Sequence, residues 1–212
     1  MLLETSNAKI VIECGFFQGG RNSEERNSSA FPFNPASCNT AIVGHAHLDH
    51  TGRLPKLVKE GFSGQIIATP PTKDLAELVL ADAQKLMEEE SERNDHESLY
   101  SKADVAKTIE KFRTISYGER VEIAKNVYLT FLNAGHILGS AISIIEADGV
   151  KIAYTSDLGN KPALLLNPPD YVSKADYAIC ESTYGGRSHE DVTKRQQLLA
   201  DIIFSLKTLM EF

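Results

Sequence analysis

The residues best suited to chemistry lie in one short run, HAHLDH, at positions 45–50. It supplies three imidazoles and one carboxylate, which are ligands that a divalent ion such as zinc accepts. His45 and His47 sit two residues apart just past a predicted strand, so they point the same way and can share one ion. Asp49 and His50 follow on the turn and can face a second ion. A chance origin has odds on the order of a few in ten thousand, so we interpret the run as a metal site.

Two ions need further ligands from elsewhere in the chain. His136 lies between glycines in AGHILGS, and glycines let the backbone approach a buried ion closely. Asp157 leaves a predicted strand in TSDLG, where a carboxylate could bridge two ions. Taken alone, each segment fits a turn or core role about as well as a ligand role, but beside the histidine cluster we expect both to supply ligands. The predicted metal ligands are His45, His47, Asp49, His50, His136 and Asp157.

Short strands alternating with helices must position these residues. The pattern predicts buried strands at 8–13, 41–43 and 65–69, and a loop over the glycine-rich stretch 14–39. It predicts helices over 51–59, from Thr72 onward and over 103–112, with the charged run 88–97 as a solvated end or loop. A meander of antiparallel strands is predicted at 121–123, 127–132, 141–145 and 150–155, followed by a strand at 178–180 and a helix over 191–212.

Length, composition and charge limit the number of domains and the classes of partner. At 212 residues the chain is long enough for one domain, or for one domain plus part of another. The net charge of −7 argues mildly against nucleic acid, although bound cations would add positive charge locally. The chain has no apolar run long enough to span a membrane and no secretory start. Cys14, Cys38 and Cys180 are scattered, which favours reduced, buried thiols in the cytoplasm.

The order HxHxDH, GH and SDLG resembles the metallo-β-lactamase superfamily. Four segments are similar to its β-CASP branch, the RNA-processing nucleases related to ribonuclease J and the polyadenylation cleavage factor: ECGFFQG at 13–19, HAHLDHTG at 45–52, AGHILGSA at 134–141 and ESTYG at 181–185. The last two segments are the specific ones. The resemblance implies an α/β (α+β) fold, the metallo-β-lactamase-type αββα sandwich, in an incomplete form.

The resemblance also implies roles for particular residues. His45, His47 and His136 would hold one ion, Asp49 and His50 the other, and Asp157 would bridge them. Asp49 and Glu181 are the candidate catalytic residues, since Asp49 could orient the attacking water and Glu181 matches an acidic residue near the leaving group. The implied reaction is hydrolysis of RNA by a water that two divalent ions activate. Zinc is the expected metal, although manganese or iron fits the same ligands.

Three departures from the family pattern accompany this resemblance. Glu13 stands where the family usually has aspartate. The family's first strand would precede Met1, and the β-CASP domain, with one more ligand for the second ion, would lie beyond Phe212. We therefore expect residues 1–190 to form the core without its first strand and C-terminal part, and residues 191–212 to begin a truncated β-CASP domain. In the family, two histidines of that later region serve the site, one as the ligand and one near the leaving group; His189 replaces neither and is expected in a solvated loop.

Two alternatives remain open. One is a small-substrate hydrolase acting on a lactam or thioester, which the absence of a basic face favours. The other is an inactive metal-binding fragment, whose exposed sheet edges predict a homodimer or aggregation. Arg53, Lys56 and Lys59 follow the histidine cluster on one predicted helix. They either reach substrate phosphates or form an ordinary solvated basic face.

Overall fold

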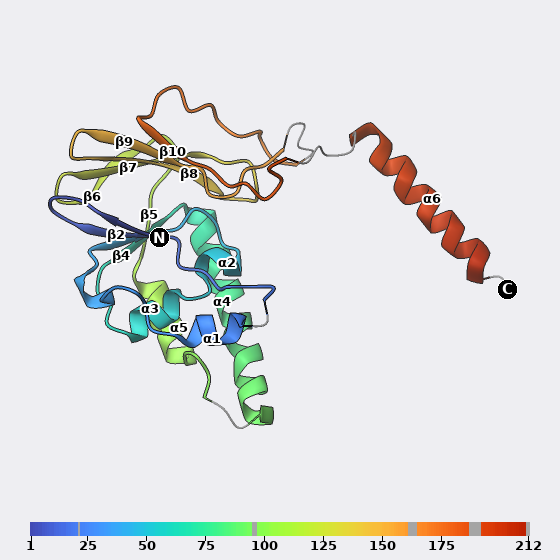
Figure 1. Ribbon diagram of the computed structural model, residues 1–212, viewed down its shortest axis with the longest axis horizontal. Helices are drawn as coiled ribbons and strands as arrows, with labels where there is room; N and C mark the ends of the chain where they lie inside the picture. Colours follow the sequence, from blue (N-terminus) through green and yellow to red (C-terminus); the bar gives the residue numbers. More distant parts are fainter. Residues whose placement is uncertain (21, 95–96, 161–164, 187–191, 211–212) are drawn as a thin grey trace. The chain divides into compact units, whose positions relative to one another are not determined.

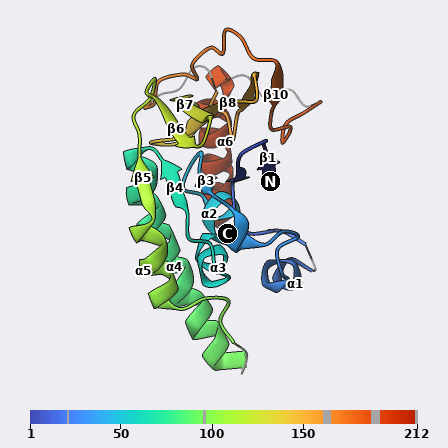
Figure 2. The same ribbon diagram turned by 90° about the vertical axis from the view of Figure 1, so that its left-hand side faces the viewer.

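The computed structural model describes residues 1–20, 22–94, 97–160, 165–186 and 192–210, and the chain divides into two compact units, Met1–Glu181 and Ser182–Phe212. The first unit is layered. Two β-sheets face each other, and helices cover the outer face of one of them (Figures 1 and 2). The predicted α/β sandwich is therefore confirmed, with two mixed sheets and flanking helices.

The first sheet contains the N-terminal strands. They are, in spatial order, β1 (Leu2–Glu4), β2 (Lys9–Ile12), β3 (Thr40–Ile42), β4 (Gln65–Ala68) and β5 (Phe112–Thr114). Strand β1 runs antiparallel to β2, and the other neighbours are parallel. Strands β2, β3 and β4 are short, apolar and buried because both faces of the sheet are covered. Strands β1 and β5 were not predicted from the sequence.

The helices of the first unit lie between these strands in the sequence. They are α1 (Ser23–Ser28), the 3₁₀ turn η1 (Pro35–Ser37), α2 (Leu48–Thr51), α3 (Leu54–Lys59), α4 (Pro70–Asn94) and α5 (Lys102–Glu110). Leu54 and Leu57 of α3 pack with Val11 and Ile66 on the outer face of the first sheet. The prediction that 14–39 is entirely loop was wrong, since α1 and η1 lie within it. Much of the charged run 88–97 is helical, because α4 continues through Asn94.

The second sheet contains the predicted meander. Its strands are β6 (Arg120–Ala124), β7 (Val127–Asn133), β8 (Ala141–Ala147), β9 (Val150–Tyr154) and β10 (Tyr177–Ile179), in spatial order β10-β9-β8-β7-β6. Strands β6 to β9 are antiparallel neighbours, as predicted, whereas β10 joins β9 in parallel. The main core lies between the two sheets, where Ile12 and Ile42 share a cluster with Leu129 and Phe131.

The second compact unit is short and spans Ser182–Phe212. Within Ser182–Phe212 the structure has the helix α6 (Val192–Met210), which confirms the predicted C-terminal helix. Its assignment to a β-CASP domain stays a prediction, and His189 lies outside the described residues. None of the helices in the described ranges is both long enough and apolar enough to cross a membrane.

Candidate metal centre

The candidate ligands follow the ends of strands from both sheets. In the first sheet, β3 leads through Val43 and Gly44 into His45. In the second sheet, His136 follows β7 and Asp157 follows β9, two strands that run in the same direction. The amide of Ala141 donates to the carbonyl of Gly44 at 2.8 Å. This hydrogen bond fixes the segments that carry the ligands side by side across the interface between the sheets.

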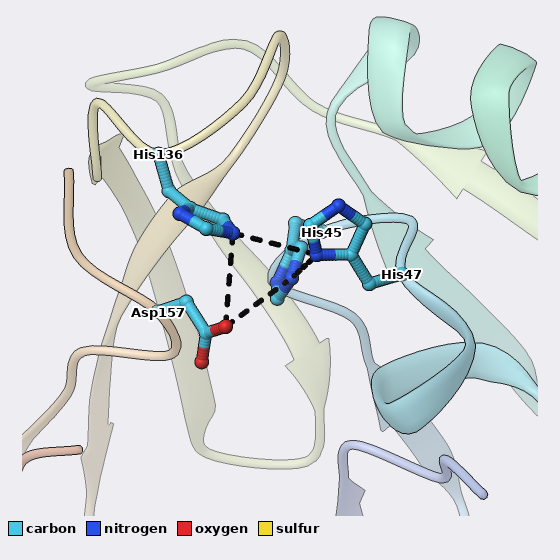
Figure 3. Close-up of side chains that lie close together, drawn as sticks. All are labelled: His45, His47, His136 and Asp157. Atoms are coloured by element: carbon cyan, nitrogen blue, oxygen red, sulfur yellow. Dashed lines mark hydrogen bonds and ion pairs between the residues drawn. The ribbon is translucent and has the colours of Figure 1, made fainter. Parts of the chain in front are cut away.

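Four side chains converge on one point. His45, His47, His136 and Asp157 turn their donor atoms toward one another in Figure 3. His47 Nδ1 lies 3.0 Å from His45 Nε2 and 3.4 Å from His136 Nε2. Asp157 Oδ2 lies 3.8 Å from His45 Nε2 and 3.7 Å from His136 Nε2. The cluster therefore presents three imidazole nitrogens and one carboxylate oxygen to a common centre.

These separations fit a bound divalent ion. In a tetrahedral zinc site with ligand bonds of about 2.0–2.1 Å, neighbouring donor atoms lie about 3.3 Å apart. The four measured separations, from 3.0 to 3.8 Å, bracket this value. Imidazole and carboxylate are also the ligand types that such an ion takes. The four donors thus have both the spacing and the chemistry of a metal site.

A second donor set shares one residue with the first. Asp49, His50 and Asp157 each offer a ligand atom to it. His50 Nε2 lies 3.6 Å from Asp49 Oδ2 and 3.3 Å from Asp157 Oδ1. Asp157 therefore presents Oδ2 to the first set and Oδ1 to the second. This set has three donors among the described residues, one fewer than the first set.

The local electrostatics favour neutral imidazole at two histidines of the first set, His45 and His136. Burial, together with the neighbouring His50, His47 and His136, lowers the pKa of His45 to about 2. Burial also lowers the pKa of His136. Burial acts in the same direction on His50, but Glu13, Asp157 and Asp49 together outweigh it and raise the pKa of this residue. A histidine held neutral keeps a lone pair free for an ion.

The His136 loop is attached to the first sheet by hydroxyl groups. Ser140 Oγ accepts from the amide of His136 at 3.0 Å. The carbonyl of Gly139 accepts from Thr69 Oγ1 at 2.7 Å and from Thr72 Oγ1 at 2.9 Å. Thr69 follows β4 in the first sheet, and Thr72 lies in the first turn of α4. These bonds attach the loop that carries His136 to the segment that follows β4 of the first sheet.

Glu181, the second candidate catalytic residue, lies beside the centre rather than in either donor set. Its Oε1 accepts from the amide of Leu158 at 2.6 Å, which places the carboxylate next to the Asp157 segment. The side chain is partly exposed. Its catalytic role stays a prediction.

The basic residues Arg53 and Lys56 were predicted either to reach substrate phosphates or to form a solvated face. Both predictions were wrong for these two residues. Arg53 and Lys56 are only 6% and 4% exposed. Both stack on the ring of Phe31, and Lys56 also pairs with Glu60. They pack the helix layer instead of facing substrate or solvent. Lys59 alone is exposed.

The three cysteines divide differently from the prediction. All three are unpaired, and Cys14 and Cys38 are buried as expected. Cys180 is exposed, so the prediction that it is buried was wrong. It directly follows β10, whose three residues are all exposed.

Two residues behind the centre were missed as functional candidates. Ser156 Oγ lies 3.1 Å from His45 Nδ1 and donates to Glu13 Oε1, also at 3.1 Å. Glu13 Oε2 lies 3.5 Å from His50 Nδ1. The sequence marked Glu13 only as an unusual residue for the family. Ser156 gave no signal beyond its position next to Asp157.

Comparison with known proteins places this architecture in a family. The family described as "Metallo-beta-lactamase superfamily domain" matches residues 2–179. Similar curated proteins include a ribonuclease of Thermus thermophilus, 37% identical over 89% of this chain and 41% of its own length. The transcription termination factor FttA of Methanothermobacter thermautotrophicus is 35% identical over 91% of this chain and 30% of its own length. Subunit 3 of the cleavage and polyadenylation specificity factor of Dictyostelium discoideum is 36% identical over 93% of this chain.

These relatives are much longer proteins, since the chain spans 41%, 30% and 25% of their respective lengths. Among solved structures, a metallo-β-lactamase from Cronobacter sakazakii matches the fold with a TM-score of 0.50 and 21% identity. That match covers 78% of this chain and 60% of the other. The resemblance inferred from the motifs is confirmed by the family match and by RNA-processing relatives. This chain belongs to the metallo-β-lactamase superfamily.

Proposed function

We propose that this chain is the catalytic core of a metal-dependent phosphodiesterase that hydrolyses RNA. The observation that carries the proposal is the pair of adjacent donor sets joined by Asp157. Two ions held a few Å apart are typical of enzymes that displace a group from phosphorus. The choice of RNA is supported by relatives that are named as a ribonuclease and as a cleavage and polyadenylation factor.

The proposed ligands follow from the geometry. His45, His47 and His136 would hold the first ion, Asp49 and His50 the second, and Asp157 both. Zinc is the proposed metal because three imidazoles and a carboxylate suit it. When bound, such ions acidify water and neutralise the charge that develops on phosphate oxygens.

The chain's own groups would then orient the reactants. Asp49 has a side chain that is 46% exposed, and its Oδ2 lies 3.6 Å from His50 Nε2. A carboxylate in this position can accept a hydrogen bond from the attacking water and hold it in line with the phosphorus. Glu181, whose Oε1 accepts from the amide of Leu158 beside the centre, is proposed to face the leaving group and to return a proton to it.

The decisive test measures metal content and cleavage together. Protein purified without chelator is analysed for bound metal and then assayed on single-stranded RNA and on a simple phosphodiester. We expect about two ions per chain and metal-dependent cleavage of both substrates. The variant Asp157→Asn should lose metal and activity, whereas its matched control Asp82→Asn, on the exposed face of α4, should retain both.

The alternatives predict other results in the same assays. Turnover of a lactam or thioester without cleavage of RNA would replace the proposal by a small-substrate hydrolase. Bound metal with no turnover of any substrate would identify a metal-binding fragment. Absence of metal from the wild-type chain would refute the proposed centre.

We also propose a cytoplasmic location, supported by three cysteines that remain unpaired. Association of two copies through an exposed sheet edge stays a prediction. Strand β10 offers such an edge, because it pairs only with β9 among the described strands. Sedimentation at increasing protein concentration would test it.

A further inference from the structure

One buried carboxylate lies behind both donor sets. The side chain of Glu13 is 9% exposed, and its two oxygens point to different partners. Oε1 accepts from the amide of Gly44 at 3.0 Å and from Ser156 Oγ at 3.1 Å. Oε2 faces His50 Nδ1 at 3.5 Å. Both Oε2 and this Nδ1 are buried, and neither makes a hydrogen bond to any other described residue.

Glu13 reaches the first donor set through Ser156, and the position of the proton on His45 follows from the atom that this histidine offers to an ion. His45 must keep the lone pair on Nε2 free, because this atom faces His47 and Asp157. With an ion on Nε2, the proton of His45 would sit on Nδ1, which lies 3.1 Å from Ser156 Oγ and would donate to it. A hydroxyl has a single proton to donate, and Ser156 directs it to Glu13. The carboxylate thus fixes the tautomer of His45 through one intermediary.

The second branch reaches the other donor set directly. His50 Nε2 faces Asp49 and Asp157, so this atom is the one that must keep its lone pair. The proton of His50 is then on Nδ1, which faces Glu13 Oε2. A carboxylate accepts hydrogen bonds at both oxygens, so Glu13 can contact Ser156 and His50 at once.

The backbone around Glu13 is shaped for this contact. Glu13 has φ 57° and Ser156 has φ 51°, both in the left-handed region that residues with a Cβ seldom adopt. A Cβ on Gly44 would lie 2.6 Å from Ser156 Oγ and 2.7 Å from Glu13 Oε1, so no side chain fits there. Three segments from two sheets therefore adopt unfavourable or tightly packed backbone conformations where they surround the Glu13 carboxylate.

We propose that Glu13 is a positioning residue shared by the two metal subsites, which fixes His45 through Ser156 and His50 by direct contact. The inference deepens the proposed function, because it concerns the same centre. It also gives a physical reason for glutamate at this position. An aspartate would withdraw the carboxylate by about 1.5 Å, the length of one carbon–carbon bond, and this backbone would then leave one histidine without its partner.

Two substitutions separate the branches. In Glu13→Gln the amide oxygen can still accept from Gly44 and Ser156, while the amide nitrogen turns toward His50. That nitrogen is a donor, so it favours a lone pair on His50 Nδ1 and moves the proton to Nε2, the atom meant for metal. Ser156→Ala removes only the intermediary to His45. The matched control is Glu119→Gln, an exposed glutamate that accepts from the amide of Ser116.

The first readout needs no metal. Nitrogen NMR of the imidazole rings in the metal-free protein should show His45 and His50 with the proton on Nδ1. Glu13→Gln should move the proton of His50 and leave that of His45, and Ser156→Ala should affect His45 alone. Wild-type rings protonated on Nε2, or a Glu13→Gln spectrum identical to wild type, would overturn the proposal.

The second readout is the affinity of each ion, measured by titration of Zn²⁺ against a chromophoric chelator. Loss of a residue that orients a metal ligand typically lowers affinity 10–100-fold. We expect this loss for the more weakly held ion in Glu13→Gln, for the more tightly held ion in Ser156→Ala, and for neither ion in Glu119→Gln. Equal loss of both ions in both variants, with unchanged ring tautomers, would overturn the proposal. Failure of the wild type to bind two ions would instead count against the proposed function, because the ring tautomers are read without metal.

Discussion

A single methyl group added at Gly159 should disrupt the proposed metal centre without replacing any of its candidate ligands. Gly159 lies two residues after Asp157, and its amide donates to the carbonyl of Ala134 at 2.9 Å. A Cβ at this position would lie 1.8 Å from the carbonyl oxygen of Gly135. The two segments in conflict carry Asp157 and His136, so Gly159→Ala forces these two ligands apart.

The size of the displacement sets the expected loss. Ordinary van der Waals contact begins at 3.4 Å, so the backbones must separate by about 1.6 Å. A zinc ligand tolerates an error of only about 0.2 Å. We therefore expect the first ion to bind at least 100-fold more weakly, about 2.7 kcal/mol. The free energy of unfolding of the metal-free protein should fall by about 1–3 kcal/mol, the usual cost of overpacking.

The assay is competition for Zn²⁺ with a chromophoric chelator, alongside urea unfolding of the metal-free protein. Gly20→Ala is the matched control, because a Cβ at Gly20 meets nothing within 4 Å. It should bind zinc like the wild type. If Gly159→Ala also binds zinc with wild-type affinity, the Asp157 and His136 segments do not approach each other as described, and the reasoning is refuted.

Three further outcomes are expected. Tyr100→Phe should raise the free energy of unfolding by about 1 kcal/mol in urea, because the buried hydroxyl has no partner among the described residues; a lower value would reveal a partner. Thr69→Val should weaken zinc binding about tenfold by releasing the carbonyl of Gly139, whereas the exposed Thr114→Val should not; equal affinities would contradict this role. The metal-free wild type should lose stability as pH falls below about 6.5, by up to about 1.4 kcal/mol per pH unit from His45, whose proton the unfolded chain binds and the folded chain excludes. His45→Gln should flatten that slope in pH-dependent thermal unfolding, and an unchanged slope would contradict the assignment.

The sequence predicted those strands and helices whose own residues show a clear hydrophobic pattern. Strands β6 and β7 alternate buried residues with more exposed ones between clear turns, and β2 and β4 consist mainly of branched apolar residues. Strands β1 and β5 have three residues each, and pairing defines them rather than pattern. Leu2, for example, is extended because it pairs with Val11. Helix α1 buries none of its residues, so it has no apolar face for a pattern to reveal.

The site was predictable to the extent that its chemistry is unusual. Histidines and an aspartate clustered beside strand ends are rare, and the structure brings all six candidate ligands into two adjoining sets. The groups that hold them were not predictable. Thr72 and Ser156 are common polar residues, and their partners lie 67 and 111 positions away in the sequence. Such a contact forms only when the two sheets pack together, so no local sequence pattern predicts it.

The division of ligands between two sheets has a consequence for the order of events during synthesis. The first sheet is complete at Thr114, and it carries His45, His47, Asp49 and His50. His136 and Asp157 belong to the second sheet, which begins at Arg120. A ribosome-bound chain that has made only the first sheet therefore lacks one donor of the first set, His136, and the donor that both sets share, Asp157. In the proposed function, both donor sets are complete only after the second sheet has formed, and metal binding would then stabilise the packing of the two sheets against each other.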